Sequence, residues 1–350
     1  MALEHIRNLV FEGGGVRGIA YVGAMKALKQ AGVLKHVKRF CGTSAGAITA
    51  WLMCYYKNRL SEIEDIQRKT DFKKFADDDP GIIRDAYRLI NRYGWHKGDN
   101  FYDWAQKITK KRFRKNHITF QELYDETDHE LLVTGCNMSK GRTVLFSKDH
   151  TPDLFVERAV RISMSIPVYF RAIFIRDSNV DVTGTITQNP GIDKEIDKKR
   201  DVFVDGGVLD NYPVQFFDAA PYVDHPLEGE LIESIAARMP PHYNKSTLGF
   251  RLDTPAEMGI GQIRRDEDKY KIENFFKYVV TLADLLQSYA NKRHLDPYDW
   301  HRTIRINTLD IRATQFALTK KDQDDLIAEG KKAAQDYLTN KYGPNLYNYV

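Results

Sequence analysis

The amino-acid sequence predicts an α/β protein in which helices cover a β-sheet of mixed strand direction. Two short apolar runs, residues 9–11 and 40–41, are each followed by a glycine-containing turn and by a segment with helical spacing. Two successive strand-to-helix units are typical of a layered α/β domain. A later pair of apolar runs, residues 130–138 and 142–147, is joined by a glycine turn and predicts an antiparallel hairpin.

Length and composition agree with a globular protein that builds its own core. The chain has 350 residues, of which 42% are hydrophobic and 29% charged. Its formal net charge of +4 is small beside 52 basic and 48 acidic residues, so we expect no nucleic-acid partner. The three cysteines, Cys41, Cys54 and Cys136, lack metal-ligand spacing and form an odd number, so we expect free, buried thiols in a reducing compartment.

The first predicted elements are short buried strands that lead into helices. Residues 9–11 form a strand before three glycines, and apolar residues then recur at helical spacing until Gly32. Residues 40–56 contain no charged side chain, but their glycines and hydroxyl residues predict a strand, a turn and a helix instead of a membrane span. Residues 60–116 are strongly charged and mostly helical in pattern, which is typical of a cap or an insertion.

The second half of the chain also mixes strand and helix signals. They are a helix over 152–163 with Pro152 in its first turn, strands over 168–175, 202–204, 246–252 and 303–309, a long helix over 272–294, and a final helix from Thr319 to about Tyr342. Residues 177–201 are polar and lack apolar periodicity, which predicts a long loop or lid. We find no internal repeat and no linker, so we expect one compact domain over residues 1–350.

The glycine-rich segment GGGVRG, residues 13–18, lies between the first strand and the first helix. It satisfies G-x-G-x-x-G, but a dinucleotide site also needs an acidic residue about 20 positions later, where residues 37–40 read VKRF. A P-loop is excluded because no Gly-Lys-Ser/Thr follows. Backbone N–H groups at a helix start bind a negative oxygen, so we expect this segment to hold either a phosphate or the oxyanion of acyl transfer.

The segment GTSAG, residues 42–46, matches the nucleophile pattern G-x-S-x-G between an apolar strand and an apolar helix. Ser44 is therefore the candidate nucleophile, and Gly42 and Gly46 leave room for the sharp bend. The helix that begins after Ser44 points its positive N-terminal end at the charge that develops there.

A serine hydroxyl needs a base. The segment VFVDGGVLDNYPV places Asp205 at the end of a predicted strand, where Gly206 and Gly207 let the chain turn and leave the carboxylate unobstructed. Taken alone, this pattern also fits an ordinary Asp-Gly turn without a catalytic role.

The motifs GGGVRG, GTSAG, SMSIPVYF and DGGVLDNYP, in this order, resemble the patatin-like phospholipase family. The resemblance covers residues 7–216 by motif and continues weakly to the C-terminal helix. It implies a three-layer α/β/α patatin-like fold with a mostly parallel or mixed central sheet. Residues 7–216 would form the catalytic core, and residues 217–350 a mainly helical C-terminal part of the same domain.

The resemblance also implies the residues of an active site. Ser44 and Asp205 would form a catalytic dyad, and residues 163–170 would pack a helix end near the nucleophile. The oxyanion hole would be shaped by glycines of the first motif beside one cationic side chain, namely Gly13, Gly14, Gly15, Gly18 and Arg17. The sequence departs from the family at Ser165 and Ile166, where alanine-rich small residues are usual, and this bears on the fit of an acyl chain.

The implied function is that of a serine lipid acyl hydrolase, of phospholipase A or lysophospholipase type, that cleaves acyl esters of membrane lipids. One alternative is a non-catalytic lipid- or protein-binding module on the same fold. Another is an esterase with a Ser-His-Asp triad, whose histidine would be one of His225, His242, His294 and His301. No Asp-rich loop or histidine cluster indicates a metal site, so we expect calcium-independent hydrolysis without a cofactor.

The expected partner is a membrane surface that presents the lipid substrate. No signal peptide or transmembrane segment is recognised, which predicts a cytoplasmic protein that attaches to membranes peripherally. The candidate contact surface is residues 95–115, which combine a basic end, residues 110–115, with Trp95, Phe101, Tyr102 and Trp104. Alternatively, these aromatic side chains pack into the core and the basic end is solvated. The sequence indicates neither the oligomeric state nor the preferred lipid headgroup.

Overall fold

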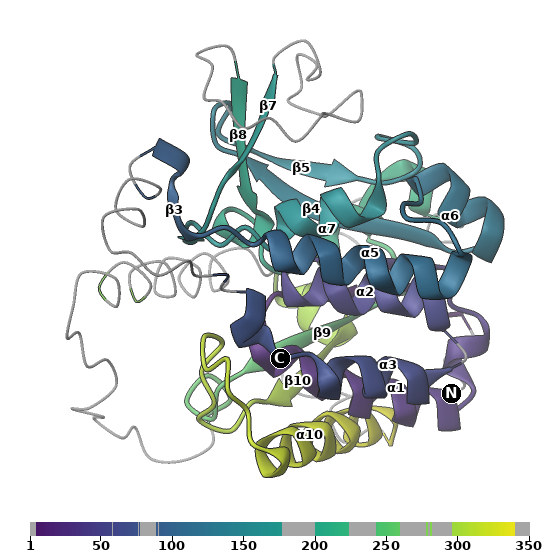
Figure 1. Ribbon diagram of the computed structural model, residues 1–350. Helices are drawn as coiled ribbons and strands as arrows, with labels where there is room; N and C mark the ends of the chain where they lie inside the picture. Colours follow the sequence, from purple (N-terminus) through teal and green to yellow (C-terminus); the bar gives the residue numbers. More distant parts are fainter. Residues whose placement is uncertain are drawn as a thin grey trace.

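A central β-sheet with helices packed on it forms the body of the protein, as the computed structural model in Figure 1 shows. The structure describes residues 5–57, 59–75, 77, 89, 91–176, 200–223, 243–259, 278, 281 and 296–339. Strand order across the main sheet is β10-β9-β1-β2-β4-β8-β7, and β5 pairs with β4. These strands are β1 (Asn8–Phe11), β2 (Arg39–Gly42), β4 (Glu130–Asn137), β5 (Arg142–Phe146), β7 (Ile173–Arg176), β8 (Arg200–Asp205), β9 (Thr247–Asp253) and β10 (Thr303–Asn307).

Strand directions in this sheet are mixed, as the sequence predicts. The five strands from β10 to β4 are parallel, whereas β5 and β8 pair antiparallel with β4, and β7 pairs antiparallel with β8. The predicted hairpin is the pair β4 and β5. Parallel strands direct their carboxyl ends to one edge, where ligand sites of α/β sheets usually lie.

Helices of the described chain connect and cover these strands. They are α1 (Ala20–Gln30), α2 (Ala45–Tyr56), α3 (Leu60–Lys69), α5 (Asp99–Phe113), α6 (Phe120–Thr127), α7 (Val156–Ser163) and α10 (Lys320–Leu338). The short 3₁₀ turns are η1 (Gly15–Ile19), η2 (Val33–Lys35), η3 (Phe72–Phe75), η5 (Gly206–Val208), η6 (Val214–Asp218), η7 (Ala220–Tyr222) and η8 (Pro297–Arg302).

Both faces of the sheet are covered. Successive side chains along each strand point to opposite faces, so each strand contributes to two cores. In β1, Leu9 and Phe11 belong to the main core, which α1, α2 and α7 cover. Val10 faces the other way and packs with Cys41 and Leu132 in a second cluster. That second cluster is closed by side chains of η6 and η7. The predicted three-layer α/β/α arrangement is confirmed, and Cys41, Cys54 and Cys136 are free and buried as expected.

The first and last described helices cross at two glycines. A Cβ atom on Gly23 would collide with the backbone of Ile327, and one on Gly330 with the backbone of Ala20. The two backbones therefore touch, and α10 lies against α1 in Figure 1. β9 also pairs with β1. The expected catalytic core, residues 7–216, and the expected C-terminal part, residues 217–350, therefore share one sheet.

The start of α10 agrees with its sequence signal, whereas its end does not. Thr319 accepts a hydrogen bond from the Asp322 N–H, and the Asp322 carboxylate accepts one from the Thr319 N–H, which forms a capping box. The helix ends at Leu338, and the predicted end at Tyr342 lies outside the described residues.

Several other predicted boundaries were wrong. Pro152 lies in a turn, because α7 begins only at Val156. The predicted strand over 168–175 is two strands, since β6 (Val168–Phe170) leaves the main sheet to pair with β3 (Gly94–His96). β3 itself interrupts the region 60–116 that we expected to be mostly helical.

The remaining expectations fall largely on residues that the structure leaves undescribed. In the predicted loop over 177–201, Arg200 and Asp201 belong to β8 and the other residues lie outside the description. In the predicted helix over 272–294, Tyr278 and Thr281 are helical and the rest is likewise outside. No helix of the described ranges is long and apolar enough to cross a membrane.

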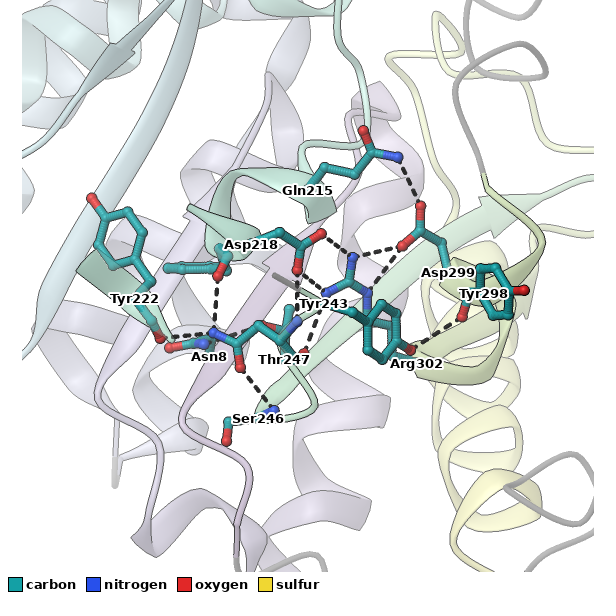
Figure 2. Close-up of polar contacts among 12 residues, drawn as sticks. Asn8, Gln215, Asp218, Tyr222, Tyr243, Ser246, Thr247, Tyr298, Asp299 and Arg302 are labelled. Carbon is teal, nitrogen blue, oxygen red and sulfur yellow. Dashed lines mark hydrogen bonds and ion pairs between the residues drawn. The ribbon is translucent and has the colours of Figure 1, made fainter. Parts of the chain in front are cut away.

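A buried ion cluster joins η6 to the start of β10, as Figure 2 shows. Arg302 donates to both carboxylate oxygens of Asp218, at 2.6 Å each, and its Nη2 donates to Asp299 Oδ1 at 2.6 Å. The guanidinium carbon lies 4.4 Å from the centre of the Tyr243 ring. The cluster therefore fixes the chain that follows the Asp205 loop against the far edge of the sheet.

Arg302→Met should lower the free energy of unfolding by about 3 kcal/mol, because Asp299 would stay buried and Asp218 partly buried without their cation. Urea unfolding followed by circular dichroism measures this change. Lys321→Ala is the control, since Lys321 forms an exposed ion pair with Asp325 and its loss should leave the urea midpoint unchanged. An Arg302→Met protein as stable as the wild type would contradict the assigned role of the cluster.

Candidate active site

Ser44 lies in a sharp turn between β2 and α2, in the backbone conformation that a nucleophile turn requires. Its φ of 54° and ψ of −123° fall in a region that non-glycine residues rarely adopt. Such strain costs about 1–3 kcal/mol and is found mostly at functional sites. Ser44 is only 4% exposed, and the first residue of α2 follows it directly, so the helix N-terminus lies beside its hydroxyl.

Two glycines make this turn sterically feasible, as the sequence predicts. A Cβ atom on Gly42 would strike the backbone of Gly46 and Ala47. A Cβ atom on Gly46 would strike the backbone of Phe11 at the end of β1. The turn is therefore pressed against the neighbouring strand, and only hydrogen atoms fit between the two backbones.

Asp205 is the last residue of β8 and is 1% exposed. Its Oδ1 accepts a hydrogen bond of 2.8 Å from the Gly207 N–H. Burial raises the pKa of the Asp205 carboxyl from 3.8 to about 7, while the Gly207 N–H and the Ser44 hydroxyl act in the opposite direction. The Ser44 hydroxyl therefore lies close enough to the Asp205 carboxyl to favour its ionised form.

The second carboxylate oxygen of Asp205, Oδ2, is buried and makes no hydrogen bond of ordinary geometry. The contact with the Ser44 hydroxyl is therefore long or poorly aligned, although it is close enough to affect the pKa of Asp205. Catalytic hydrogen bonds are often of this kind before substrate binds. The structure thus brings the two predicted residues together without a fully formed hydrogen bond.

The loop after Asp205 is held by two threonines. A Cβ atom on Gly206 would lie 2.5 Å from Thr134 Oγ1, so this position has no room for a side chain. Thr134 Oγ1 lies 2.5 Å from Thr43 Oγ1, and Thr43 donates to the carbonyl oxygen of Asp210 at 3.1 Å. Thr43, the residue before the candidate nucleophile, is therefore tied to the loop of the candidate base.

The glycine-rich segment faces Ser44, and its first glycine is held by Asn211. The Gly13 N–H donates to the Asn211 carbonyl oxygen at 3.0 Å, and Asn211 Nδ2 donates back to the Gly13 carbonyl at 2.9 Å. A Cβ atom on Gly13 would lie 3.1 Å from the Ser44 Cβ. Gly13 therefore shapes the space above Ser44, but its N–H is already in use.

The next two glycines keep their N–H groups available. Among the described residues, neither the Gly14 N–H nor the Gly15 N–H donates to a protein acceptor. Gly15 has a φ of 56°, and a Cβ atom there would collide with the backbone of Ala313. Gly18 packs closely on Ala45. The C-terminal part of the chain, through Ala313, therefore helps to form this segment.

Arg17 braces the glycine-rich segment from within. Its Nε donates to the Gly14 carbonyl oxygen at 3.2 Å, and its guanidinium also acts on the carboxyls of Glu12 and Glu257. Burial raises the pKa of Glu12 to about 7, while Arg251 and Arg17 are among the groups that oppose this rise. The expected cation therefore lies beside the glycines and is shared with neighbouring acidic groups.

The end of α7 lies beside Ser44, as the resemblance implied for residues 163–170. Ser163 Oγ accepts a hydrogen bond of 2.9 Å from the Ser44 N–H, and the Ser165 carbonyl accepts one of 2.9 Å from the Asp205 N–H. Arg161 donates to Ser165 Oγ at 2.6 Å and to the Gly98 carbonyl at 2.9 Å. No local pattern reveals the hydrogen bonds of Ser163 to Ser44 and of Ser165 to Asp205, because each joins residues far apart in the sequence.

Of the four histidines considered for a triad, the structure describes His301. His301 lies in η8, before the amino end of β10, whereas Ser44 follows the carboxyl end of β2. Since β10 and β2 run parallel, His301 lies at the opposite edge of the sheet from Ser44. The other three candidates, His225, His242 and His294, lie outside the described residues, which also contain no cluster of three potential metal ligands.

A cavity of about 330 Å³ borders the glycine-rich segment and the start of α2. Gly15, Gly18 and Ala45 form one wall, and the apolar walls include Ile48, Trp104 and Phe316. Ser44 and Asp205 are not part of the lining, so the cavity lies beside the dyad and not around it.

Two of the four aromatic residues in segment 95–115 follow the expectation of packing into the core. Phe101 is buried, and the Trp104 ring contacts the rings of Trp51 and Phe75, so both pack with the core. The basic end of α5 approaches Tyr55, whose carbonyl accepts from Arg112 Nε at 2.9 Å. Tyr55 is about three turns of α2 away from Ser44, on the order of 16 Å.

Comparison with known proteins gives one family and several relatives. The sequence model named patatin-like phospholipase matches residues 9–218, which is more than half of the chain. The protein YqhO of Bacillus subtilis (strain 168), described as uncharacterized, is 27% identical over 340 residues, which cover 94% of this chain and 97% of YqhO. "Probable lipid hydrolase 463L" of Invertebrate iridescent virus 6 is 23% identical over 216 residues, which cover 60% of this chain and 63% of that protein.

Among solved structures, VipD from Legionella pneumophila shares the fold. The match has a TM-score of 0.52 and 16% sequence identity, and it covers 95% of this chain and 66% of the VipD chain.

Asp205→Asn should stabilise the fold increasingly as the pH rises. In the wild type, the folded protein binds a proton at Asp205 up to about pH 7, whereas the unfolded chain releases it near the ordinary value of 3.8. The protonated Asp205 therefore contributes its full stabilisation at pH values below its pKa in the unfolded chain. This stabilisation is lost as the pH rises through the folded-state pKa of about 7.

Asparagine does not titrate, so the variant should gain about 2–3 kcal/mol relative to the wild type between about pH 5 and about pH 8. Urea unfolding at a series of pH values measures this difference. A difference that stays constant over the range would contradict the raised pKa of Asp205.

Proposed function

The chain belongs to the patatin-like phospholipase family, and from this membership we propose that it is a serine lipid acyl hydrolase of phospholipase A or lysophospholipase type. The name of the relative 463L, a probable lipid hydrolase, agrees with hydrolysis of lipid esters. The finer assignment is supported above all by one observation, the buried carboxylate of Asp205 interacting with a serine in a strained turn.

In the proposed acylation step, Ser44 Oγ attacks the carbonyl carbon of a lipid ester while the Asp205 carboxylate takes the hydroxyl proton. The tetrahedral intermediate collapses, the bond to the alcohol oxygen breaks, and Asp205 returns the proton to the leaving alcohol. The acyl group stays on Ser44 as an ester. A positioned base of this kind contributes about 10²- to 10⁴-fold to the rate.

In the proposed deacylation step, water attacks the acyl-serine and Asp205 takes its proton. Collapse of the second intermediate releases the fatty acid and returns the proton to Ser44 Oγ. A carboxylate is ordinarily a weak base at neutral pH, but a pKa near 7 brings it into the range in which proton transfer is efficient.

The oxyanion of both intermediates is assigned to the glycine-rich segment. Gly14 and Gly15 would donate their available N–H groups, while Gly13 keeps the space above Ser44 clear and Arg17 holds the segment in shape. Each such donor is worth about 10²- to 10³-fold in rate. The positive end of α2 adds to the same field.

The cavity beside the dyad is the proposed site of the acyl chain. The apolar part of its wall, with Ile48, Trp104 and Phe316, suits a hydrocarbon. The rest of the wall is polar and includes Arg68, Lys69 and Asp71. Gly15, Gly18 and Ala45 connect the cavity to the glycine-rich segment. The membrane is the proposed source of the substrate, with peripheral attachment. We further propose that residues 1–350 act as one domain, in which residues 7–216 supply the dyad and residues 217–350 complete the sheet and the glycine segment.

Ser44→Ala and Asp205→Asn should each lower the hydrolysis of a soluble acyl ester by at least about 10³-fold. Only Ser44→Ala should also abolish covalent labelling by a fluorophosphonate probe through removal of the reacting oxygen. Asp201→Asn is the matched control, since Asp201 is another buried carboxylate of β8 and contacts Asn137 at 2.7 Å instead of the dyad. Full activity of the Ser44→Ala protein would rule out the dyad and point to another nucleophile. A wild type that neither hydrolyses the ester nor reacts with the probe would favour a non-catalytic binding role.

The pH dependence of kcat/KM should show a loss of activity below about pH 7, because the base must be ionised and burial holds its pKa near that value. Glu157→Gln is the control, since burial also raises the pKa of Glu157 to about 7, yet its carboxylate contacts Thr109. The variant should keep the same acid limb. An acid limb of the kcat/KM profile near the ordinary carboxyl pKa would show that Asp205 does not cause the pH dependence. Loss of this limb in Glu157→Gln would show the same.

A further inference from the structure

The last turn of α7 touches both members of the proposed dyad. Ser163 Oγ accepts the Ser44 N–H at 2.9 Å, and two residues later the Ser165 carbonyl accepts the Asp205 N–H at 2.9 Å. Both serines of this turn are fully buried. A single short segment therefore contacts the backbone of the nucleophile and the backbone of the base.

The Ser44 N–H depends on Ser163 for its hydrogen bond. Ser44 precedes α2 in a conformation with positive φ, so its N–H lies outside the helical hydrogen-bond ladder. Its acceptor is the side chain of Ser163, and Ser44 itself is 4% exposed. A buried N–H without an acceptor is unfavourable, so this hydrogen bond favours the strained turn over relaxed alternatives.

The position of Ser163 is itself well determined. Residues Ala159–Ser163 of α7 are all buried, and the Met164 and Ser165 N–H groups donate to carbonyls of α7. Arg161 holds the turn from the side, with its guanidinium bonded to Ser165 Oγ and to the carbonyls of Lys97 and Gly98. The hydroxyl of Ser163 is thus presented from a rigid element, as accurate placement requires.

We propose that Ser163 is a positioning residue, which holds the Ser44 backbone in its strained conformation and thereby sets Ser44 Oγ at its working distance from Asp205. This inference rests on the proposed hydrolase function. It assigns no contact with substrate to Ser163, because the Ser163 hydroxyl reaches the backbone of Ser44. Displacement of a reacting atom by about 1 Å costs on the order of 10²-fold in rate, so the effect should be large.

The test compares Ser163→Ala and Ser163→Thr with the wild type in hydrolysis of a soluble acyl ester. Ser163→Ala removes the acceptor and should lower kcat by about 10²-fold with KM within about twofold, because the proposed acyl-chain cavity is unchanged. Ser163→Thr keeps a hydroxyl and should recover most of the lost kcat. If Ser163 had only a structural role, kcat would not recover when threonine restores the hydroxyl group.

Ser147→Ala is the matched control. Ser147 is also a fully buried serine whose hydroxyl is bonded, in this case to His150, and it lies at the end of β5 without contact to the dyad. Its replacement should lower stability without changing kcat. If Ser163→Ala fails to fold, Ser163→Cys replaces it, since a thiol fills the site but is a weak acceptor and should also lower kcat.

The outcomes separate the two proposals. A wild type that neither hydrolyses the ester nor reacts with a fluorophosphonate would overturn the proposed function, and the role of Ser163 with it. An active wild type whose kcat is unchanged in Ser163→Ala, or is lowered equally in Ser163→Thr, would overturn the positioning role alone.

Discussion

The active-site turn depends on backbone segments that touch with no side chain between them. Gly46 lies against Phe11 at the end of β1, and Gly42 lies against the next turn of its own chain. The strained φ of Ser44 costs about 1–3 kcal/mol. Each fully buried large apolar side chain of α2 contributes about 1.5–3 kcal/mol, and all twelve residues of that helix are buried, so its packing easily holds the turn in place.

Burial of Asp205 has opposite effects on its proposed role as a base and on the stability of the fold. A carboxylate that interacts with a serine and is shielded from water becomes a better base, yet its charge is unfavourable inside the fold. Contacts from distant parts of the chain hold the site against this tendency. Asn211 hydrogen-bonds to Gly13, and Ala313 packs on Gly15. Arg302 binds Asp218 at the end of η6.

Local patterns in the sequence were enough to predict the strands that precede Ser44 and Asp205 and the turns that follow them, whereas the catalytic role of Asp205 was implied by the family resemblance. Ser44 and Asp205 each end a short apolar run at a glycine-rich turn, and such signals need no knowledge of the rest of the chain. The resemblance placed Ser163 near the nucleophile, but its hydrogen bond to Ser44 could not be predicted. The same holds for the hydrogen bond of Asn211 to Gly13, because both join residues far apart in the sequence. β3 was missed because its pairing partner β6 lies far along the chain, and three residues carry almost no periodic signal.

The crossing of α1 and α10 at Gly23 and Gly330 has a consequence for the order of events during synthesis. β1 emerges from the ribosome early, but its neighbour β9 and the covering helix α10 are made only near the end. Ala313 must also be present before the glycine segment can close. A growing chain therefore carries the proposed nucleophile long before it can complete the proposed oxyanion cradle, so under the proposed function an unfinished polypeptide would not yet act as a hydrolase.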